Sequence, residues 1–186
     1  LPESFGNLTA LVDLALSGTE LTTLPESFGN LLNLHTLGVS INSIQNGIPS
    51  IPNLISFKIY GGDFNTISES IGNLNSLQDL RIEDTPITSL PSTIGDLNNL
   101  TLLVIEYNPN LASIPSSIGN LSNLEYLGLR NNVLTSLPNS LCDLSSSCTI
   151  SVLNNNLCEE YKFDCINWGY YWVCDGQHWC LQDCQE

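Results

Sequence analysis

The chain has 186 residues, with 19 acidic and four basic side chains and a formal net charge of −15. This balance argues against nucleic acid as a partner, because phosphate binding requires clustered lysine and arginine, and it disfavours an anionic membrane surface. Hydrophobic residues make up 42% of the chain, enough to form a core, so the charge does not indicate disorder. The length allows one or two domains.

A segment of about 23 residues recurs along the chain. The first copy, residues 1–23, contains LPESFGNL followed by spaced leucines, and the second copy repeats LPESFGNL almost verbatim. The third copy, residues 47–66, is shortened because it lacks the Gly-Asn-Leu segment. The clearest copy, residues 114–136, reads L-x-x-L-x-x-L-x-L-x-x-N-x-L over its leucines, with Asn132 at the asparagine place. The copies predict stacked coils, because one such coil cannot bury a core alone.

These motifs resemble the leucine-rich repeat family over roughly residues 1–157. The resemblance implies an α/β-type solenoid, in which each L-x-L segment forms one strand of a parallel sheet on the concave side. The convex side is expected to be irregular or 3-10 helical. We therefore expect about seven coils in residues 1–157, and a Cys- and Trp-rich C-terminal cap in residues 158–186.

The asparagine place carries a structural demand, because a side-chain amide there bonds the backbone where the chain leaves the strand. Four coils meet this demand, with Asn42, Asn108, Asn132 and Asn155. Three coils do not, and we expect looser or shifted backbone there, most of all in the third coil; the residues are Thr19, Gly62 and Thr85.

Proline and glycine punctuate each return segment. The Leu-Pro and Ile-Pro pairs predict extended backbone at Pro25, Pro91, Pro115 and Pro138. The glycines that follow are expected to allow a tight turn before the next leucine; they are Gly29, Gly72, Gly95 and Gly119.

The first coil looks like an interior repeat, because no polar or disulfide-bonded cap precedes it. Two interpretations stay open: further repeats precede Leu1 in the natural protein, or this end meets another molecule. Head-to-tail contacts of the second kind propagate into a fibre when they do not close. The chain lacks methionine, a signal peptide and an apolar run long enough to span a bilayer, which favours a mature or excised fragment.

Strand alternation places the residues between the inward leucines on the concave side. Read across the coils, the central row is Ala15, Gly38, Lys58, Arg81, Val104, Gly128 and Ser151. The next row is Ser17, Ser40, Tyr60, Glu83, Glu106, Arg130 and Leu153. Three of the four basic residues and several tyrosines fall on this side, and Tyr and Arg are residue types that anchor recognition surfaces.

The predicted binding residues are Lys58, Tyr60, Asp79, Arg81, Glu83, Glu106, Tyr107, Tyr126 and Arg130. The resemblance supports this prediction, since leucine-rich repeats usually engage partners through the concave surface. The alternative is that the cations only offset neighbouring carboxylates on the sheet.

Three N-x-S/T sequons, at Asn7, Asn99 and Asn120, are candidate glycosylation sites in a eukaryotic host. Each lies in the return segment, away from the predicted binding face. Rows of Thr and Ser outside the strands, such as Thr88 and Thr135, are interpreted as turn hydroxyls; an ordered lattice as their ligand is the weaker alternative.

All seven cysteines follow Ser140, which predicts a disulfide-stapled cap and an oxidising, extracellular location. The candidates are Cys142, Cys148, Cys158, Cys165, Cys174, Cys180 and Cys184. The odd number leaves one over, free or paired outside this chain. Cys142–Cys148 and Cys158–Cys165 are plausible local pairs that spacing does not fix. The three tryptophans of the tail are interpreted as an apolar plug over the last coil, or else as an exposed aromatic patch.

Catalysis finds no support in the sequence, since no nucleophile motif or glycine-rich phosphate loop is present. Acidic pairs such as Glu83 with Glu106 would lie on an open sheet without a pocket to raise one pKa. A zinc site around His178 is disfavoured, because its spacing fits no standard finger. We expect no enzyme, cofactor or metal.

The sequence thus predicts an extracellular, non-enzymatic recognition module that binds a protein or glycan through its concave face. The alternative is a structural subunit of a surface layer, matrix or filament, assembled from copies of itself through the solenoid ends. Neither nucleic acid nor membrane insertion is expected.

Overall fold

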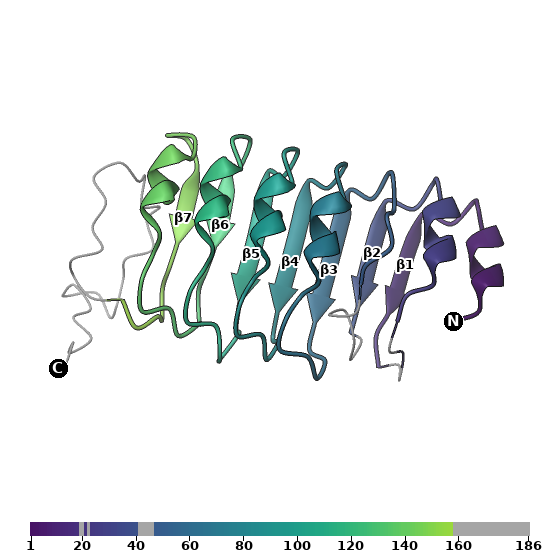
Figure 1. The fold of residues 1–186 in the computed structure, drawn as a ribbon, viewed down its shortest axis with the longest axis horizontal. Coiled ribbons are helices and arrows are strands. Elements are labelled where there is room, and N and C mark those ends of the chain that lie inside the picture. The colour runs from purple at the N-terminus through teal and green to yellow at the C-terminus, as the bar shows by residue number, and fades with distance from the viewer. Residues whose placement is uncertain (19–20, 22, 41–46, 158–186) are drawn as a thin grey trace.

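A computed structural model describes residues 1–18, 21, 23–40 and 47–157. The coils stack in chain order into one elongated solenoid, with the N-terminus at one end of the stack (Figure 1). Each coil contributes one short strand: β1 Asp13–Leu16, β2 Thr36–Val39, β3 Ser56–Tyr60, β4 Asp79–Glu83, β5 Leu102–Glu106, β6 Tyr126–Gly128 and β7 Thr149–Ser151. The seven strands form one parallel sheet in sequence order, which confirms the predicted solenoid with a parallel sheet.

Short 3-10 helices form the return side of the coils, and Figure 1 shows them in a row along one side of the sheet. The described residues contain six: η1 Glu3–Asn7, η2 Glu26–Asn30, η4 Glu69–Asn73, η5 Ser92–Asp96, η6 Ser116–Asn120 and η7 Asn139–Asp143. The third coil has no helix in its described residues, 47–66. Its sequence lacks the Gly-Asn-Leu segment that ends the helix in neighbouring coils.

The core lies between the sheet and the row of helices. The inward leucines of the strands are fully buried, as at Leu37, Leu80 and Leu127, each with 0% of its surface exposed. Helix residues such as Ile94 and Ile118 close the core from the other side, also at 0%. The leucine spacing therefore acts as predicted in the interior coils, where the repeated apolar positions point into one continuous core.

The prolines have the extended backbone that their ring and their position predict. Pro25, Pro91, Pro115 and Pro138 immediately precede a 3-10 helix, with φ between −63° and −72° and ψ between 141° and 148°. This confirms the expected extended approach to the return segment.

The helix glycines have a different role from the predicted one. None of Gly29, Gly72, Gly95 or Gly119 has positive φ, so no special turn conformation requires glycine there. A Cβ at Gly72 would lie 2.7 Å from both Cβ and O of Thr93 in the next coil. Cβ atoms at Gly95 and Gly119 would collide in the same way with a serine of the following coil. Close stacking of the coils therefore demands glycine at these three positions.

Buried asparagines link consecutive coils, as the sequence predicted. The Nδ2 group of Asn108 donates to the carbonyls of Ile82 and Glu106, at 3.2 and 3.0 Å. The Oδ1 atom of Asn132 accepts from the backbone N–H of Asn108 at 3.0 Å. Each amide thus satisfies backbone groups of its own coil and of the preceding coil, at 0% and 5% exposure respectively.

The expected loosening at the non-asparagine coils is only partly correct. In the third coil, Gly62 at the asparagine place has a positive φ of 86°, which no residue at that place has in the other described coils, so the backbone is shifted there. Thr85 contradicts the expectation, because it is buried and both its N–H and its hydroxyl donate to Oδ1 of Asn108. A threonine hydroxyl thus joins the polar ladder that asparagine makes elsewhere. Thr19 and Asn42 lie outside the described residues.

Candidate functional site

The solvent-facing side of the seven-stranded sheet, called the sheet face below, carries the predicted contact residues. The strand register aligns its central row, and it runs Ala15, Gly38, Lys58, Arg81, Val104, Gly128, Ser151. In the next row, Tyr60, Glu83 and Glu106 are also register partners. The alignment of these residues predicted from the leucine spacing therefore agrees with the observed strand register.

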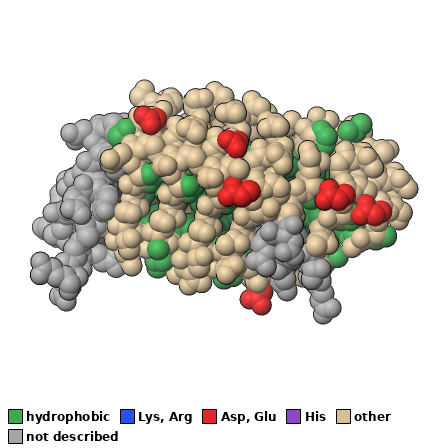
Figure 2. All heavy atoms as spheres, viewed as in Figure 1, with side chains coloured by type: hydrophobic (Ala, Val, Ile, Leu, Met, Phe, Trp, Pro, Cys, Tyr) green, Lys and Arg blue, Asp and Glu red, His purple; other side chains and the backbone are tan. Residues whose placement is uncertain are grey.

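Basic side chains are confined to this face in the described part of the chain. Lys58 and Arg81 belong to β3 and β4, and Arg130 follows β6. Figure 2, in the view of Figure 1, shows scattered Asp and Glu side chains and no Lys or Arg among its described residues. Among the described residues, the sheet face is thus the surface that combines both signs of charge.

Two ion pairs organise the charged middle of the sheet face. Arg81 Nε contacts Asp79 Oδ1 at 3.1 Å, and both residues belong to β4. Arg130 Nε contacts Glu106 Oε1 at 3.1 Å, which joins the sixth coil to β5. The alternative from the sequence, that cations offset nearby carboxylates, therefore holds for these two arginines.

Gly128 makes the second pair possible. A Cβ on Gly128 would lie 2.6 Å from Glu106 Oε1 and 3.0 Å from the Tyr126 ring, so a larger residue would displace the Glu106 carboxylate from this arrangement. Glu106 is 6% exposed. Its hydrogen bond is the largest cause of a raised pKa for Arg130, and Tyr126 adds to it. The sequence placed Gly128 in the central row, but the spacing did not show that the Glu106 and Tyr126 side chains lie against it.

Glu83 is the carboxylate of this face with a perturbed pKa. Desolvation is the main cause that raises the pKa of Glu83, and the nearby carboxylates of Glu106 and Asp84 raise it further. Arg81 and Lys58 act in the opposite direction. Glu83 is therefore surrounded by both charge signs, without a contact close enough to be an ion pair in the described residues.

A column of left-handed residues runs just beyond the strands. Its members have φ between 54° and 64° and are Gly18, Gly61, Asp84, Tyr107, Asn131 and Asn154. Glycine, asparagine and aspartate tolerate this conformation, whereas it is uncommon for a bulky residue such as tyrosine. Tyr107 is also 52% exposed. The sequence placed Tyr107 among the contact residues but gave no sign of this backbone conformation.

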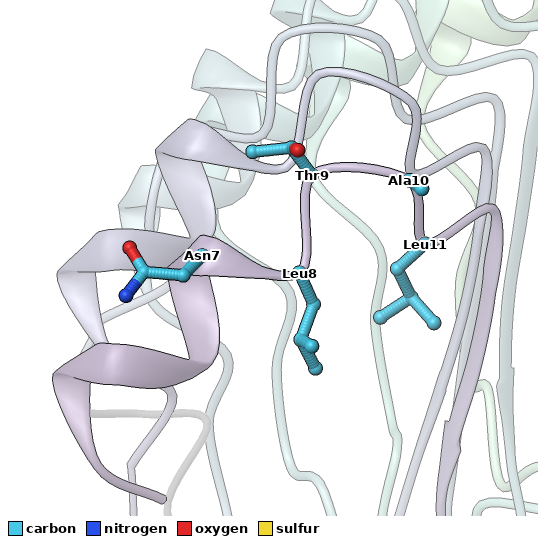
Figure 3. Close-up of a pocket in the computed structure, with 5 residues that line it drawn as sticks. All are labelled: Asn7, Leu8, Thr9, Ala10 and Leu11. Carbon is cyan, nitrogen blue, oxygen red and sulfur yellow. The ribbon is translucent and has the colours of Figure 1, made fainter.

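The open end of the first coil is the second candidate region. A pocket of about 450 Å³ there is lined by Asn7, Leu8, Thr9, Ala10 and Leu11. Figure 3 shows the Leu8 and Leu11 side chains pointing into the space between the helix and the strand of the first coil. Leu8 is 49% exposed, whereas the matching Leu121 of the sixth coil is 0% exposed. This end therefore exposes apolar surface that interior coils bury.

The three sequon asparagines are all exposed and lie on the return side. Asn7 and Asn120 end η1 and η6, and Asn99 follows η5, where its Nδ2 donates to the Asn75 carbonyl at 2.7 Å. Among the predicted turn hydroxyls, Thr88 Oγ1 donates to the Asn65 carbonyl. Glycosylation stays a prediction.

The predicted local disulfide Cys142–Cys148 is wrong. Cys148 is a free cysteine, and burial raises its pKa to about 11, while Cys142 is disulfide-bonded. The Cys148 thiol sits in the core in a place where earlier coils carry leucine. The tail lies outside the described residues, and with it Cys158, Cys165, Cys174, Cys180, Cys184, His178 and the three tryptophans.

Within the described ranges, no group of three or more His, Cys, Asp or Glu side chains is placed to hold a metal ion. The same part of the chain contains no helix long and apolar enough to cross a membrane.

Known structures share this architecture. The leucine-rich repeat ectodomain of the Arabidopsis thaliana receptor kinase GASSHO1/SCHENGEN3, solved with CASPARIAN STRIP INTEGRITY FACTOR 2, is 30% identical with a TM-score of 0.63. The match covers 85% of this chain and 20% of that one. Listeria monocytogenes InlP is 26% identical with a TM-score of 0.65, over 82% of this chain and 41% of InlP.

A leucine-rich repeat protein of Leptospira interrogans is 26% identical with a TM-score of 0.54, over 86% of this chain and 47% of that one. The chain thus spans less than half the length of each of these proteins. Among curated proteins, none matches it. A family model described as a leucine-rich repeat region matches residues 54–160, more than half of the chain. The stacked coils, their parallel sheet and this match agree: the chain belongs to the leucine-rich repeat family.

Proposed function

We propose that the chain is an extracellular, non-enzymatic recognition module that binds a protein or glycan partner through its sheet face, the predicted concave side. The contact set is Lys58, Tyr60, Asp79, Arg81, Glu83, Glu106, Tyr107, Tyr126 and Arg130. Leucine-rich repeat relatives solved as ectodomains with a bound factor support a protein partner. The cysteine-rich tail, residues 158–186, is proposed to cap the last coil, in agreement with an oxidising location.

One observation carries this proposal: the scarce cations and an exposed tyrosine gather on one face of a strongly acidic protein. The chain has four basic residues in total, and Lys58, Arg81 and Arg130 share the sheet face. Tyr107, which directly follows β5 and is predicted to lie on the same side, is half-exposed with φ of 60°. A strained, exposed aromatic residue is costly for the fold alone, and such outliers are enriched at ligand-binding sites.

The test combines Arg81→Glu with Tyr126→Ala and measures binding of the partner captured from the protein's source. Loss of binding by at least about 100-fold is expected, because charged and aromatic anchors dominate interfaces. A matched control is Ser92→Glu with Ser116→Glu, which makes the same charge change on the exposed first residues of η5 and η6. Unchanged binding by the first variant would show that the sheet face is the wrong surface.

The structural-subunit alternative has its own observation, the apolar open end of the first coil. Leu1 and Leu8 are 40% and 49% exposed, and Leu8 lines the pocket of Figure 3. Assembly through this end predicts oligomers that grow with concentration and that Leu8→Asp disrupts. Light scattering that shows a monomer at millimolar concentration under non-reducing conditions would exclude such an assembly.

A further inference from the structure

Lys58 and Arg81 form an unusual arrangement on the sheet face. They are direct register partners on neighbouring strands, so two like charges stand side by side. Like charges directly opposite on a sheet are destabilising. Half of the basic residues in a chain of 186 are used for this one unfavourable pair.

The ion pair of Arg81 does not separate the two cations. Asp79 precedes Arg81 by two residues on the same strand and contacts it through Nε, with Oδ1 and Oδ2 at 3.1 and 3.4 Å. Asp79 also accepts from the Ser56 hydroxyl at 3.4 Å, which directs its carboxylate along the outer row of the sheet. Lys58 makes no ion pair with any described residue. Its ammonium group is therefore available to a ligand.

A third donor lies on the other side of Lys58. Gly38 is the register partner of Lys58 on β2, and a Cβ built on Gly38 would lie 3.3 Å from the Tyr60 hydroxyl. The Tyr60 side chain thus leans over Gly38, and its hydroxyl reaches the central row. The order along this row is the Tyr60 hydroxyl above β2, Lys58 on β3 and Arg81 on β4.

The row between β2 and β5 holds no acidic residue. Gly38 and Val104 flank Lys58 and Arg81, and neither carries a charge. Glu83 lies in the neighbouring row, where its effect on Lys58 is electrostatic rather than a contact. A ligand atom above Lys58 and Arg81 therefore meets three hydrogen-bond donors and no competing carboxylate in the same row.

We propose that Tyr60, Lys58 and Arg81 form a subsite for a carboxylate of the partner, an Asp or Glu side chain on a protein segment that crosses strands β2 to β4. This proposal rests on the proposed function and names the chemistry of its ligand. A carboxylate accepts several hydrogen bonds at once, and charge-assisted bonds are roughly twice as strong as neutral ones. It also removes the repulsion between Lys58 and Arg81.

The net charge of −15 makes this proposal easy to separate from non-specific attraction. Long-range electrostatics favours basic ligands on every surface of the protein and repels acidic ones. A preference for an acidic peptide over its neutral version therefore requires a local site. The test uses a phage-displayed library of random dodecapeptides, selected on the whole chain and then measured as synthetic peptides by calorimetry.

We expect selected peptides to contain a required Asp or Glu. Replacing that residue with Asn or Gln should weaken binding about tenfold or more, and Lys58→Gln should weaken the acidic peptide by a similar factor. Lys58→Gln should have little effect on binding of the neutral peptide, because the peptide substitution and Lys58→Gln remove the same carboxylate–ammonium interaction. Lys58→Arg should largely restore affinity. Ser116→Asp is the matched control, since it lowers the net charge by one on η6.

The other outcomes separate the two proposals. One outcome is that peptide binding weakens with Arg81→Glu and Tyr126→Ala but requires no carboxylate and is unaffected by Lys58→Gln. This result would overturn the carboxylate subsite while still supporting recognition by the sheet face. Peptides whose binding responds to no substitution on the sheet face, or a library that yields no binder, would count against both.

Discussion

The first and sixth coils have nearly the same pattern but different surroundings. Both contain a 3-10 helix, a strand in the same register and leucines at the same places. Leu121 is fully buried between two coils, whereas Leu8, in the first coil of the given sequence, is 49% exposed. A repeat therefore obtains its local geometry from its own sequence and most of its burial from its neighbours.

The polar contacts between coils show the same difference. In the sixth coil, Asn123 Nδ2 donates to the Asn98 carbonyl of the preceding coil at 2.7 Å. Matching donors occur at Asn33, Asn53, Ser76 and Asn99. The first coil has Ala10 at this place, which has no donor to offer. The open end thus differs from interior coils in polar chemistry as well as in exposure.

The largest expected effect is the difference between two leucine deletions. Leu121→Ala should lower the free energy of unfolding by about 3 to 5 kcal/mol, because it leaves a cavity between coils. Leu8→Ala should cost less than about 1 kcal/mol, since half of its surface is already in water. Urea denaturation monitored by circular dichroism measures both. Equal costs would show that the first coil is covered in solution.

The next effect concerns the buried amide of the sixth coil. Asn132→Ala should cost about 2 to 3 kcal/mol, because it removes the partners of the Ile105 and Leu129 carbonyls and of the Asn108 N–H. The control is Asn123→Ala, an exposed donor whose loss should cost about 0.5 kcal/mol. A similar stability for both variants would mean that water replaces the buried amide.

A pair of glycine substitutions tests the other side of the first coil. A Cβ on Gly6 would lie 2.6 Å from Ser27 Cβ, and a Cβ on Gly119 would lie 2.7 Å from Ser140 Cβ. Gly6→Ala and Gly119→Ala should therefore each cost about 1 to 3 kcal/mol through overpacking. Gly29→Ala is the milder control, since its nearest atom in the next coil is Ser50 O at 3.1 Å. A small loss at Gly6 alone would show that the first two coils stack loosely.

The smallest expected effect has the opposite sign. Tyr107→Asn should raise the free energy of unfolding by about 0.5 to 1 kcal/mol, because asparagine tolerates positive φ better than tyrosine does. Asn131, at the same place in the sixth coil, has φ of 56°. The same substitution should weaken partner binding at least about tenfold. A variant that is less stable and binds normally would mean that Tyr107 serves the fold.

The leucine spacing predicted the stacked coils and the rows of residues across them, and the resemblance to leucine-rich repeats supplied the strands and the sheet. The inward leucines count off the strands, so Lys58 opposite Arg81, and Glu83 opposite Glu106, followed directly from the repeat. This works because a parallel solenoid keeps each repeat position in one row, whatever residue occupies it. The 3-10 helices followed from the family resemblance, and their absence in the described part of the third coil follows its missing segment.

Contacts between coils were not predictable, because they depend on side-chain direction. The spacing did not show that Tyr60 leans over Gly38, that Glu106 lies over Gly128, or that Thr85 joins the amide ladder. The glycines of the helices were assigned to turns, whereas the structure requires Gly72, Gly95 and Gly119 for close stacking. Cys142–Cys148 was considered a plausible pair, yet Cys148 is free and its side chain lies in the core.

The most direct test of sheet-face recognition is hydroxyl-radical footprinting of the protein alone and with the partner from its source. The radical oxidises exposed tyrosine and leucine side chains, so Tyr107 reports on the sheet face and Leu8 on the open end. We predict that the partner lowers oxidation of Tyr107 severalfold and leaves Leu8 unchanged. Protection of Leu8, with Tyr107 oxidised as in the free protein, would contradict this account and identify the solenoid end as the binding surface.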